Sequence, residues 1–348
     1  MLFSGLNKIS LWCKKITMNI ENEVDRLPTL NPERLRLITK IAALSHEEGL
    51  GQGEISKKLN LSQARVSRYL KAALAEGIVR TVVVQPRGIY VGLEKALEQK
   101  FQLREVVIVE HIEGTSLTAS LGSAAATYLE TTLTSQEHIG ISSWSSTLLA
   151  TVEAMRSRPR KVVNEVIQLI GGIGSPQAQI RASRLVGHLA ALTSATPQYI
   201  AAPGVASSAE VKKAFLSDPS VASTMGAWQR VTTLLVGIGA FPASPLFAAS
   251  GNALNADEEA QLAKDGAVGE ICLRYFDGSG NEMNPQIEER VISIDSGTMK
   301  AIPRRIAVAG GEPKLNAIRA AIEGGWVNVL ITDAETARQL LEPPRLAR

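Results

Sequence analysis

Short β-branched runs alternate with helical patterns from about residue 104 to the end of this chain, and this alternation constrains the fold more than any other feature. A crossover helix between consecutive strands makes those strands pair in parallel. We expect strands at 106–110, 139–142, 166–170, 199–201, 233–238, 271–276, 306–309 and 327–332, and helices at 117–133, 147–155, 178–193, 209–216, 315–323 and 334–341. The fold class predicted for residues 104–348 is therefore α/β, with a Rossmann-like parallel sheet.

A different pattern precedes this domain, because residues 31–91 have the features of a winged helix-turn-helix. Helices are expected at 31–49, 52–59 and 63–76. Asn31 and Ser62 are the capping residues of the first and third, and glycines follow both of these helices. Apolar residues at helical spacing give the third helix one buried stripe, formed by Val66, Leu70, Ala73 and Leu74. The β-rich run 78–84, a turn at 85–88 and a return at 89–91 predict a wing. A linker helix is expected at 92–103.

The outer face of the third helix is the candidate nucleic-acid surface. In a helix-turn-helix, the face of the recognition helix opposite its apolar stripe enters the DNA major groove. The candidates on that face are Ser62, Gln63, Ala64, Arg65, Ser67 and Arg68. Candidates for phosphate contacts are Lys57, Lys58 and Arg80. An arginine-rich helix face is also a common solvated surface. Residues 31–91 carry ten Lys or Arg against five Asp or Glu, whereas the whole chain has a net charge of +3, so a basic unit on a near-neutral remainder favours DNA as a partner.

Composition restricts the compartment. No apolar run approaches the roughly 18–20 residues that a membrane span needs, so we expect no membrane partner. Cys13 and Cys272 are too few for a disulfide framework and suit a reducing cytoplasm. Residues 1–30 are expected to be a disordered tail, and the short apolar run near their start lacks the charge order of a signal peptide.

Polar and small residues gather where several expected strands end, which is where open α/β sheets bind ligands. A hydroxyl-rich run precedes a helix and could hold an anion: Ser142, Ser143, Ser145, Ser146 and Thr147. A glycine turn would let the backbone approach a ligand: Gly171, Gly172 and Gly174. Glu270 suits sugar hydroxyls and Lys314 suits a phosphate. Each signal has a structural alternative, because hydroxyls cap helices, glycines make tight turns and most charged groups are solvated.

Catalytic and metal sites are not indicated. None of the four histidines stands beside a Ser, a Cys or an acid in a nucleophilic arrangement, and no spacing of His, Cys and acids suggests a metal site. The GxxxxGK[ST] phosphate loop is missing as well. We therefore expect no catalytic residue, metal or cofactor, and interpret the strand ends as a pocket for a small, hydroxyl-rich and phosphorylated molecule.

The order of several motifs resembles the SorC family of bacterial transcriptional regulators, also called sugar-binding DeoR-like regulators, over residues 31–342. The motifs are the helix-turn-helix 55–70, QLIGGIG at 168–174, AAP at 201–203, VGIG at 236–239, GAVGEI at 266–271, IP at 302–303, VAGG at 308–311 with Lys314, and GG at 324–325 before LITD at 330–333. One departure concerns the hydroxyl-rich loop, which in the family often reads Gly-x-x-Trp-Gly-x-Thr. Here Ser143 and Ser145 alter its length and remove a glycine.

This resemblance implies an effector domain similar to sugar-phosphate isomerases and deaminases, a homo-oligomer, commonly a tetramer, and an effector pocket lined by the candidates above. The expected function is a repressor of a carbohydrate or polyol catabolic operon, with operator affinity controlled by a phosphorylated sugar, a sugar or a polyol. The expected domains are a tail 1–30, a DNA-binding domain 31–91, a linker 92–103 and an effector and oligomerisation domain 104–348. The alternative is a sugar-phosphate isomerase or deaminase with an appended DNA-binding domain, in which Glu270 is the general base.

Overall fold

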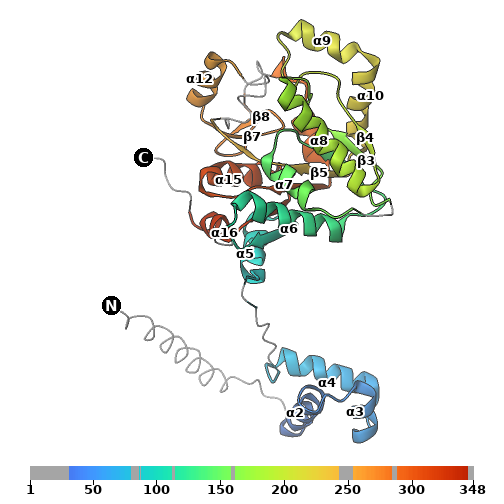
Figure 1. Ribbon diagram of the computed structural model, residues 1–348. Helices are drawn as coiled ribbons and strands as arrows, with labels where there is room; N and C mark the ends of the chain where they lie inside the picture. Colours follow the sequence, from blue (N-terminus) through green and yellow to red (C-terminus); the bar gives the residue numbers. More distant parts are fainter. Residues whose placement is uncertain are drawn as a thin grey trace. The chain divides into compact units, whose positions relative to one another are not determined.

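The computed structural model describes residues 31–79, 86, 88–111, 114–157, 161–242, 254–283 and 288–343. The chain divides into two compact units, residues 1–84 and residues 85–348 (Figure 1). The expected tail 1–30 and half of the expected wing, residues 80–85 and 87 with Arg80 among them, lie outside the described residues. The expected return at 89–91 is wrong, because residues 89 and 90 form no strand and Val91 begins a helix. Within the described ranges, each helix is too short or too polar to span a bilayer.

The described part of the first unit consists of helices packed around a small core. Their bounds are α2 (Pro32–His46), α3 (Gln52–Leu59) and α4 (Gln63–Ala75). Asn31 caps α2 by accepting a hydrogen bond from the N–H of Glu33 at 3.0 Å, and Ser62 caps α4 by accepting one from the N–H of Arg65 at 3.3 Å. Asn60 ends α3 at φ 52°, a left-handed conformation that asparagine tolerates.

The core of this unit shows where the expected stripe of α4 is correct and where it is wrong. Its central buried side chains are Ile41, Leu44, Ile55 and Val66. Ala73 is buried too, but Leu74 is 51% exposed. The stripe follows residues 66, 70 and 73, and Leu74 lies about 40° beyond Leu70 on the side away from Ala73, outside the buried face.

In the second unit, the described residues include a sheet of seven strands in the order β1-β10-β9-β5-β2-β3-β4. The strand bounds are β1 (Glu105–Val109), β2 (His138–Ile141), β3 (Glu165–Gln168), β4 (Thr196–Gln198), β5 (Thr233–Val236), β9 (Arg304–Val308) and β10 (Val329–Asp333). All neighbouring strands pair in parallel. Leu234 and Val236 belong to one hydrophobic cluster and Leu235 to another, because successive side chains of a strand point to opposite faces. The predicted parallel α/β domain is confirmed.

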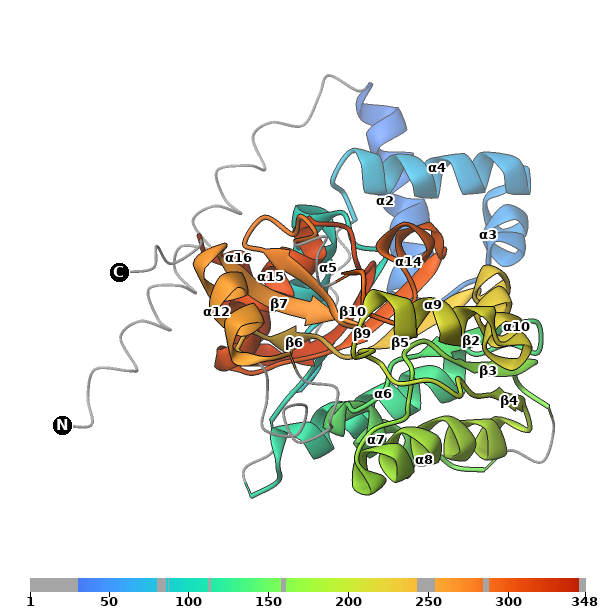
Figure 2. The same cartoon turned by 90° about the horizontal axis from the view of Figure 1, so that it is seen from above.

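Helices cover both faces of this sheet. One face carries α6 (Leu117–Thr132), α7 (Ser146–Ala154) and α8 (Pro176–Thr193), which lie together on one side of the strands in Figure 2. The remaining described α-helices are α5 (Val91–Phe101), α9 (Ala209–Ser217), α10 (Pro219–Ala227), α12 (Ala256–Lys264), α14 (Ser296–Ala301), α15 (Leu315–Glu323) and α16 (Ala334–Leu341). Within the expected linker, α5 buries Leu97 completely in the core of the second unit.

Two of the predicted strands are wrong. Residues 271–276 do not form one strand of the main sheet, because the chain makes an antiparallel hairpin of β7 (Ala267–Ile271) and β8 (Arg274–Asp277), with β6 (Gly239–Ala240) alongside β7. Cys272 and Leu273 turn the hairpin at φ 54° and 64°, without the Asn-Gly pair that usually signals two positive φ angles. The strand expected at 199–201 lies earlier, at β4 on the sheet edge, where Pro197 is tolerated.

Candidate functional site

The N-terminal half of α4 presents most of the residues predicted to read DNA. The exposed ones are Ser62, Gln63, Ala64, Arg65 and Arg68, and Ser67 is half-buried. Arg65 contacts Tyr69 one turn on: its Nη2 donates to the Tyr69 hydroxyl at 3.2 Å, and the guanidinium lies 5.9 Å from the ring centroid. This contact holds the Arg65 side chain along the outer face of the helix.

The candidate phosphate contacts have different surroundings. Lys57 and Lys58 are both exposed on α3. The ammonium of Lys58 lies 3.1 Å from a carboxylate oxygen of Glu48, an ion pair that is about half exposed on each side. Such a pair contributes little to stability and exchanges readily for another anion.

In the second unit, a cavity of about 540 Å³ opens where β2 and β5 end. Its described lining residues are Ser142, Ser143, Trp144, Ser145, Ser146, Ile170, Gly237, Ile238, Gly239, Ala240, Pro242, Glu270, Cys272, Leu273, Tyr275, Pro313 and Lys314. Six of the predicted effector residues are therefore brought together from three separate parts of the chain. The cavity is the site expected at the carboxyl ends of the strands.

The serines in the loop between β2 and α7 are held by local hydrogen bonds. Ser142 Oγ accepts from the N–H of Gly237 at 3.4 Å, and Ser143 Oγ accepts from the buried amide of Gln168 at 3.4 Å. Ser145 caps α7 by accepting from the N–H of Leu148 at 3.2 Å. The loop therefore combines the structural role of a cap with hydroxyls at the cavity wall.

Glu270 and Lys314 give the cavity its charges. Glu270 Oε2 accepts from the N–H of Leu273 at 2.9 Å, and Lys314 Nζ donates to the carbonyl of Ile238 at 2.8 Å. Burial raises the pKa of Glu270, while the Leu273 N–H and the Lys314 charge oppose the shift. Burial also lowers the pKa of Lys314, against the attraction of Glu270. A carboxyl acceptor and an ammonium donor, both half-buried, thus face one cavity.

The other predicted effector residues do not line this cavity. Thr147 is buried in α7, with only 7% of its surface exposed. Gly171 packs against the 202–203 backbone, where a Cβ would lie 2.1 Å from the carbonyl oxygen of Pro203, and a Cβ on Gly172 would lie 2.4 Å from the Gln168 amide. Gly174 is also outside the lining. Close packing, and not a ligand at this cavity, explains Gly171 and Gly172.

Sequence reasoning missed the aromatic side chains of the cavity and, apart from Glu270, the residues that the hairpin contributes. Tyr275 lies directly opposite Glu270 across β7 and β8, a relationship that depends on the unrecognised turn. Trp144 adopts φ 57°, an unusual conformation for a large side chain, in the middle of the serine loop. The Val236-Gly-Ile-Gly239 run was a usable signal, and its two glycines do line the cavity.

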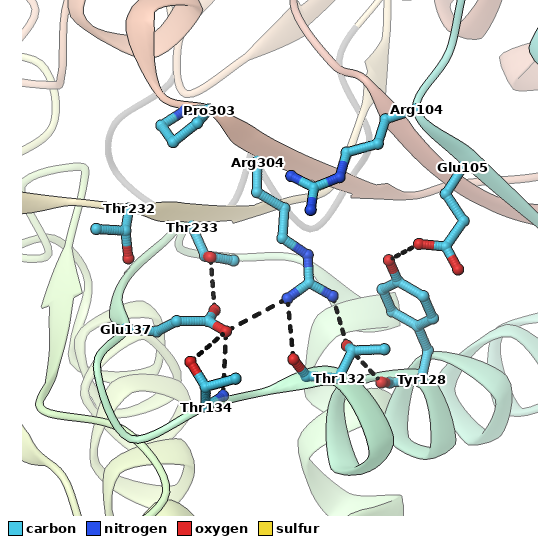
Figure 3. Close-up of a pocket in the computed structure, with 10 residues that line it drawn as sticks. All are labelled: Arg104, Glu105, Tyr128, Thr132, Thr134, Glu137, Thr232, Thr233, Pro303 and Arg304. Atoms are coloured by element: carbon cyan, nitrogen blue, oxygen red, sulfur yellow. Dashed lines mark hydrogen bonds and ion pairs between the residues drawn. The ribbon is translucent and has the colours of Figure 1, made fainter.

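A second cavity, of about 350 Å³, lies at the opposite ends of the strands (Figure 3). Arg304 and Glu137 form its centre, with Nη1 and Oε1 3.5 Å apart, and Glu137 also accepts from the Thr233 hydroxyl at 2.6 Å. Arg304 donates to the Thr132 hydroxyl, and Tyr128 donates to Glu105 at 2.5 Å. Because these polar groups satisfy one another, we interpret this cavity as a structural network.

Comparison with known proteins agrees with the two-unit architecture. A family model described as "Putative sugar-binding domain" matches residues 90–342, and one described as "Winged helix-turn-helix DNA-binding" matches residues 41–80. The chain belongs to the SorC family of sugar-binding transcriptional regulators. The resemblance inferred from the motifs is confirmed. Among the described residues of this SorC-family chain, no cluster of His, Cys, Asp and Glu could hold a metal ion.

Individual relatives match almost the whole chain. It is 30% identical over 314 residues to the deoxyribonucleoside regulator of Bacillus subtilis, covering 90% of this chain and 99% of that protein. It is 28% identical over 321 residues to the sorbitol operon regulator of Klebsiella pneumoniae, covering 90% and 99%. The crystal structure of full-length SorC from Klebsiella pneumoniae matches with a TM-score of 0.68 and 26% identity, covering 90% of this chain and 100% of that one.

Proposed function

We propose that this SorC-family regulator represses a carbohydrate or polyol catabolic operon and leaves its operator when a sugar phosphate occupies the 540 Å³ cavity. The observation that carries the proposal is the meeting of Lys314, Glu270 and the serine loop at one cavity. Lys314 and the N-terminal end of α7 suit a phosphate group, and Glu270 suits sugar hydroxyls. A matched screen of phosphorylated and free sugars by thermal shift tests it, because a ligand of the folded state raises the melting temperature.

The variant Lys314→Met tests how much the phosphate group contributes to effector binding. It removes the ammonium and keeps a side chain of similar length. We expect the thermal shift from a phosphorylated sugar to shrink, while the smaller shift from the free sugar is retained. If wild type responds equally to both forms, the effector is not phosphorylated, and the proposal is reduced to a sugar or polyol.

DNA reading is assigned to α4. In this proposal Gln63, Arg65, Ser67 and Arg68 contact base edges, and Lys57, Lys58 and Arg80 contact phosphates. Arg65→Ala and Arg68→Ala should each cost about 1–3 kcal/mol of operator binding and relax specificity at one base. Lys57→Ala should weaken binding to all DNA sequences by a similar factor. It should also reduce by about 1 the slope of the logarithm of the binding constant against the logarithm of the salt concentration. Unchanged operator binding in both arginine variants would show that the recognition-helix assignment is wrong.

The active species in this proposal is a cytoplasmic homotetramer. Support comes from the family resemblance, and from the fact that helix-turn-helix proteins bind paired half-sites as symmetric oligomers. Light scattering of the purified full-length chain, with and without operator DNA, measures the assembly directly. A monomer or a dimer on DNA would contradict the proposed tetramer.

The rival function is a sugar-phosphate isomerase or deaminase. It is favoured by one observation, the raised pKa of Glu270 in a cavity that also holds Lys314. Incubation of pentose and hexose phosphates with wild type and Glu270→Gln, followed by product analysis, distinguishes the two functions. Turnover in wild type that is lost in the variant would assign an enzyme.

A further inference from the structure

Tyr275 is buried at the cavity with an unused hydroxyl. The residue is 3% exposed, and its Oη has no hydrogen-bond partner among the described residues. Three other buried side-chain atoms of the described residues share this condition, in Arg305, Thr332 and Gln339, but none of those residues lines the 540 Å³ cavity. A buried hydroxyl without a partner destabilises the folded protein, so its retention at a cavity wall points to a ligand.

The hairpin determines where the Tyr275 ring lies. Tyr275 and Glu270 are direct partners in the antiparallel ladder of β7 and β8, so their side chains stand on the same face. The edge contact with Phe241, at 6.0 Å between centroids and 89° between planes, supports the ring from one side. A carboxyl and a phenol from adjacent strands therefore face the same cavity.

The protonation state of Tyr275 is settled by its surroundings. Burial raises its pKa strongly, and the carboxyls of Glu270, Glu259 and Glu258 raise it further. The phenol remains neutral, with one O–H to donate and lone pairs to accept. This chemistry matches an alcohol group better than a phosphate, which is matched by Lys314 elsewhere in the lining.

We propose that Tyr275 binds one hydroxyl group of the carbohydrate effector and makes the cavity selective for effectors that carry a hydroxyl at that position. This inference rests on the proposed function and names a specificity-determining residue for it. The effector class is thereby narrowed to polyhydroxy compounds with at least two recognised hydroxyls, one at Glu270 and one at Tyr275.

The test uses full-length Tyr275→Phe with matched sugars that differ by one hydroxyl, such as ribose 5-phosphate and 2-deoxyribose 5-phosphate or glucose 6-phosphate and its 2-deoxy analogue. Tyr128→Phe is the control, because it removes a hydroxyl that does have a partner, Glu105, in the second cavity (Figure 3). Melting temperatures are measured without ligand, and dissociation constants are measured by titration.

Without ligand, Tyr275→Phe should melt at or above the wild-type temperature, whereas Tyr128→Phe should melt below it. The affinity of Tyr275→Phe for the best-binding sugar should fall about tenfold, and its preference over one deoxy analogue should disappear. Tyr128→Phe should retain both affinity and preference.

Each other result has a definite meaning. A lower melting temperature of ligand-free Tyr275→Phe would show that the hydroxyl has a structural partner, and would overturn the inference. Equal affinities and preferences in wild type and Tyr275→Phe would overturn it while leaving the proposed function intact. If no sugar or sugar phosphate binds wild type, the proposed function fails and the inference fails with it.

Discussion

At the scale of single residues, Glu270 is held in the cavity at a cost in stability. Its pKa is raised by burial, so the folded state favours the neutral carboxyl and loses stability as pH rises above the unfolded value of 4.5. We expect Glu270→Gln to melt above wild type at pH 8 and close to it at pH 4, because glutamine can still accept from the N–H of Leu273. Melting curves from pH 4 to pH 8 check this. A difference that does not vary with pH would contradict the assignment of the shift to Glu270.

Glu137, in contrast, is expected to stabilise the folded protein through its ion pair with Arg304. Its side chain is 13% exposed and that of Arg304 is 10% exposed, so removal of one partner leaves a buried charge. Glu137→Ala should lower the free energy of unfolding by about 3 kcal/mol, measured by urea denaturation. Glu153→Ala is the matched control: its ion pair with Arg184 is 3.2 Å long but about half exposed, and should contribute at most about 1 kcal/mol. Similar losses in the two variants would show that the Glu137 network is effectively solvated.

At the scale of elements, the contact between β6 and β7 holds the Glu270 carboxyl. A Cβ on Gly239 would lie 2.1 Å from Glu270 Oε1, so Gly239→Ala must displace the carboxyl from its place in the cavity. Ligand affinity should fall at least as far as in Glu270→Gln, with a stability loss of about 1–3 kcal/mol. Gly226→Ala in α10 meets nothing within 4 Å and should be neutral or stabilising by up to about 1 kcal/mol. The affinities of both variants are measured by titration with the best-binding sugar. Full affinity in Gly239→Ala would show that the carboxyl does not bind the ligand.

The same elements show how far the sequence can predict the site. The parallel strands and their polar carboxyl ends follow from periodicity, because strands that alternate with helices leave their ends on one edge of the sheet. The β7–β8 hairpin cannot be predicted from periodicity, because Cys272 and Leu273 adopt left-handed conformations that are unusual for these residue types. Without that turn, the pairing of Glu270 with Tyr275 cannot be seen. The packing of Gly171 against Pro203 is equally hidden, because the two residues are joined only by the tertiary fold.

At the scale of the whole molecule, a sensor requires that ligand binding in the second unit change the operator affinity of the first. The basic surplus belongs to residues 31–91 and the cavity to the second unit, so different parts of the chain form the two candidate binding surfaces. A sugar can weaken operator binding only if it binds the released form more tightly than the DNA-bound form. The strength of regulation is therefore a coupling between two affinities, separate from how tightly either ligand binds.

This coupling is reciprocal, which gives a test that needs no knowledge of the pathway between the sites. If a sugar phosphate lowers operator affinity by a given factor, saturating operator DNA must lower the affinity for that sugar phosphate by the same factor, typically about 5- to 150-fold. Isothermal titration of the sugar phosphate with and without operator, beside operator titrations with and without the sugar phosphate, measures both factors. Tyr275→Phe should weaken sugar binding in both series, whereas Arg65→Ala should weaken only operator binding. Unequal factors would show that an unmeasured equilibrium, such as a change of oligomeric state, is linked to one of the two ligands.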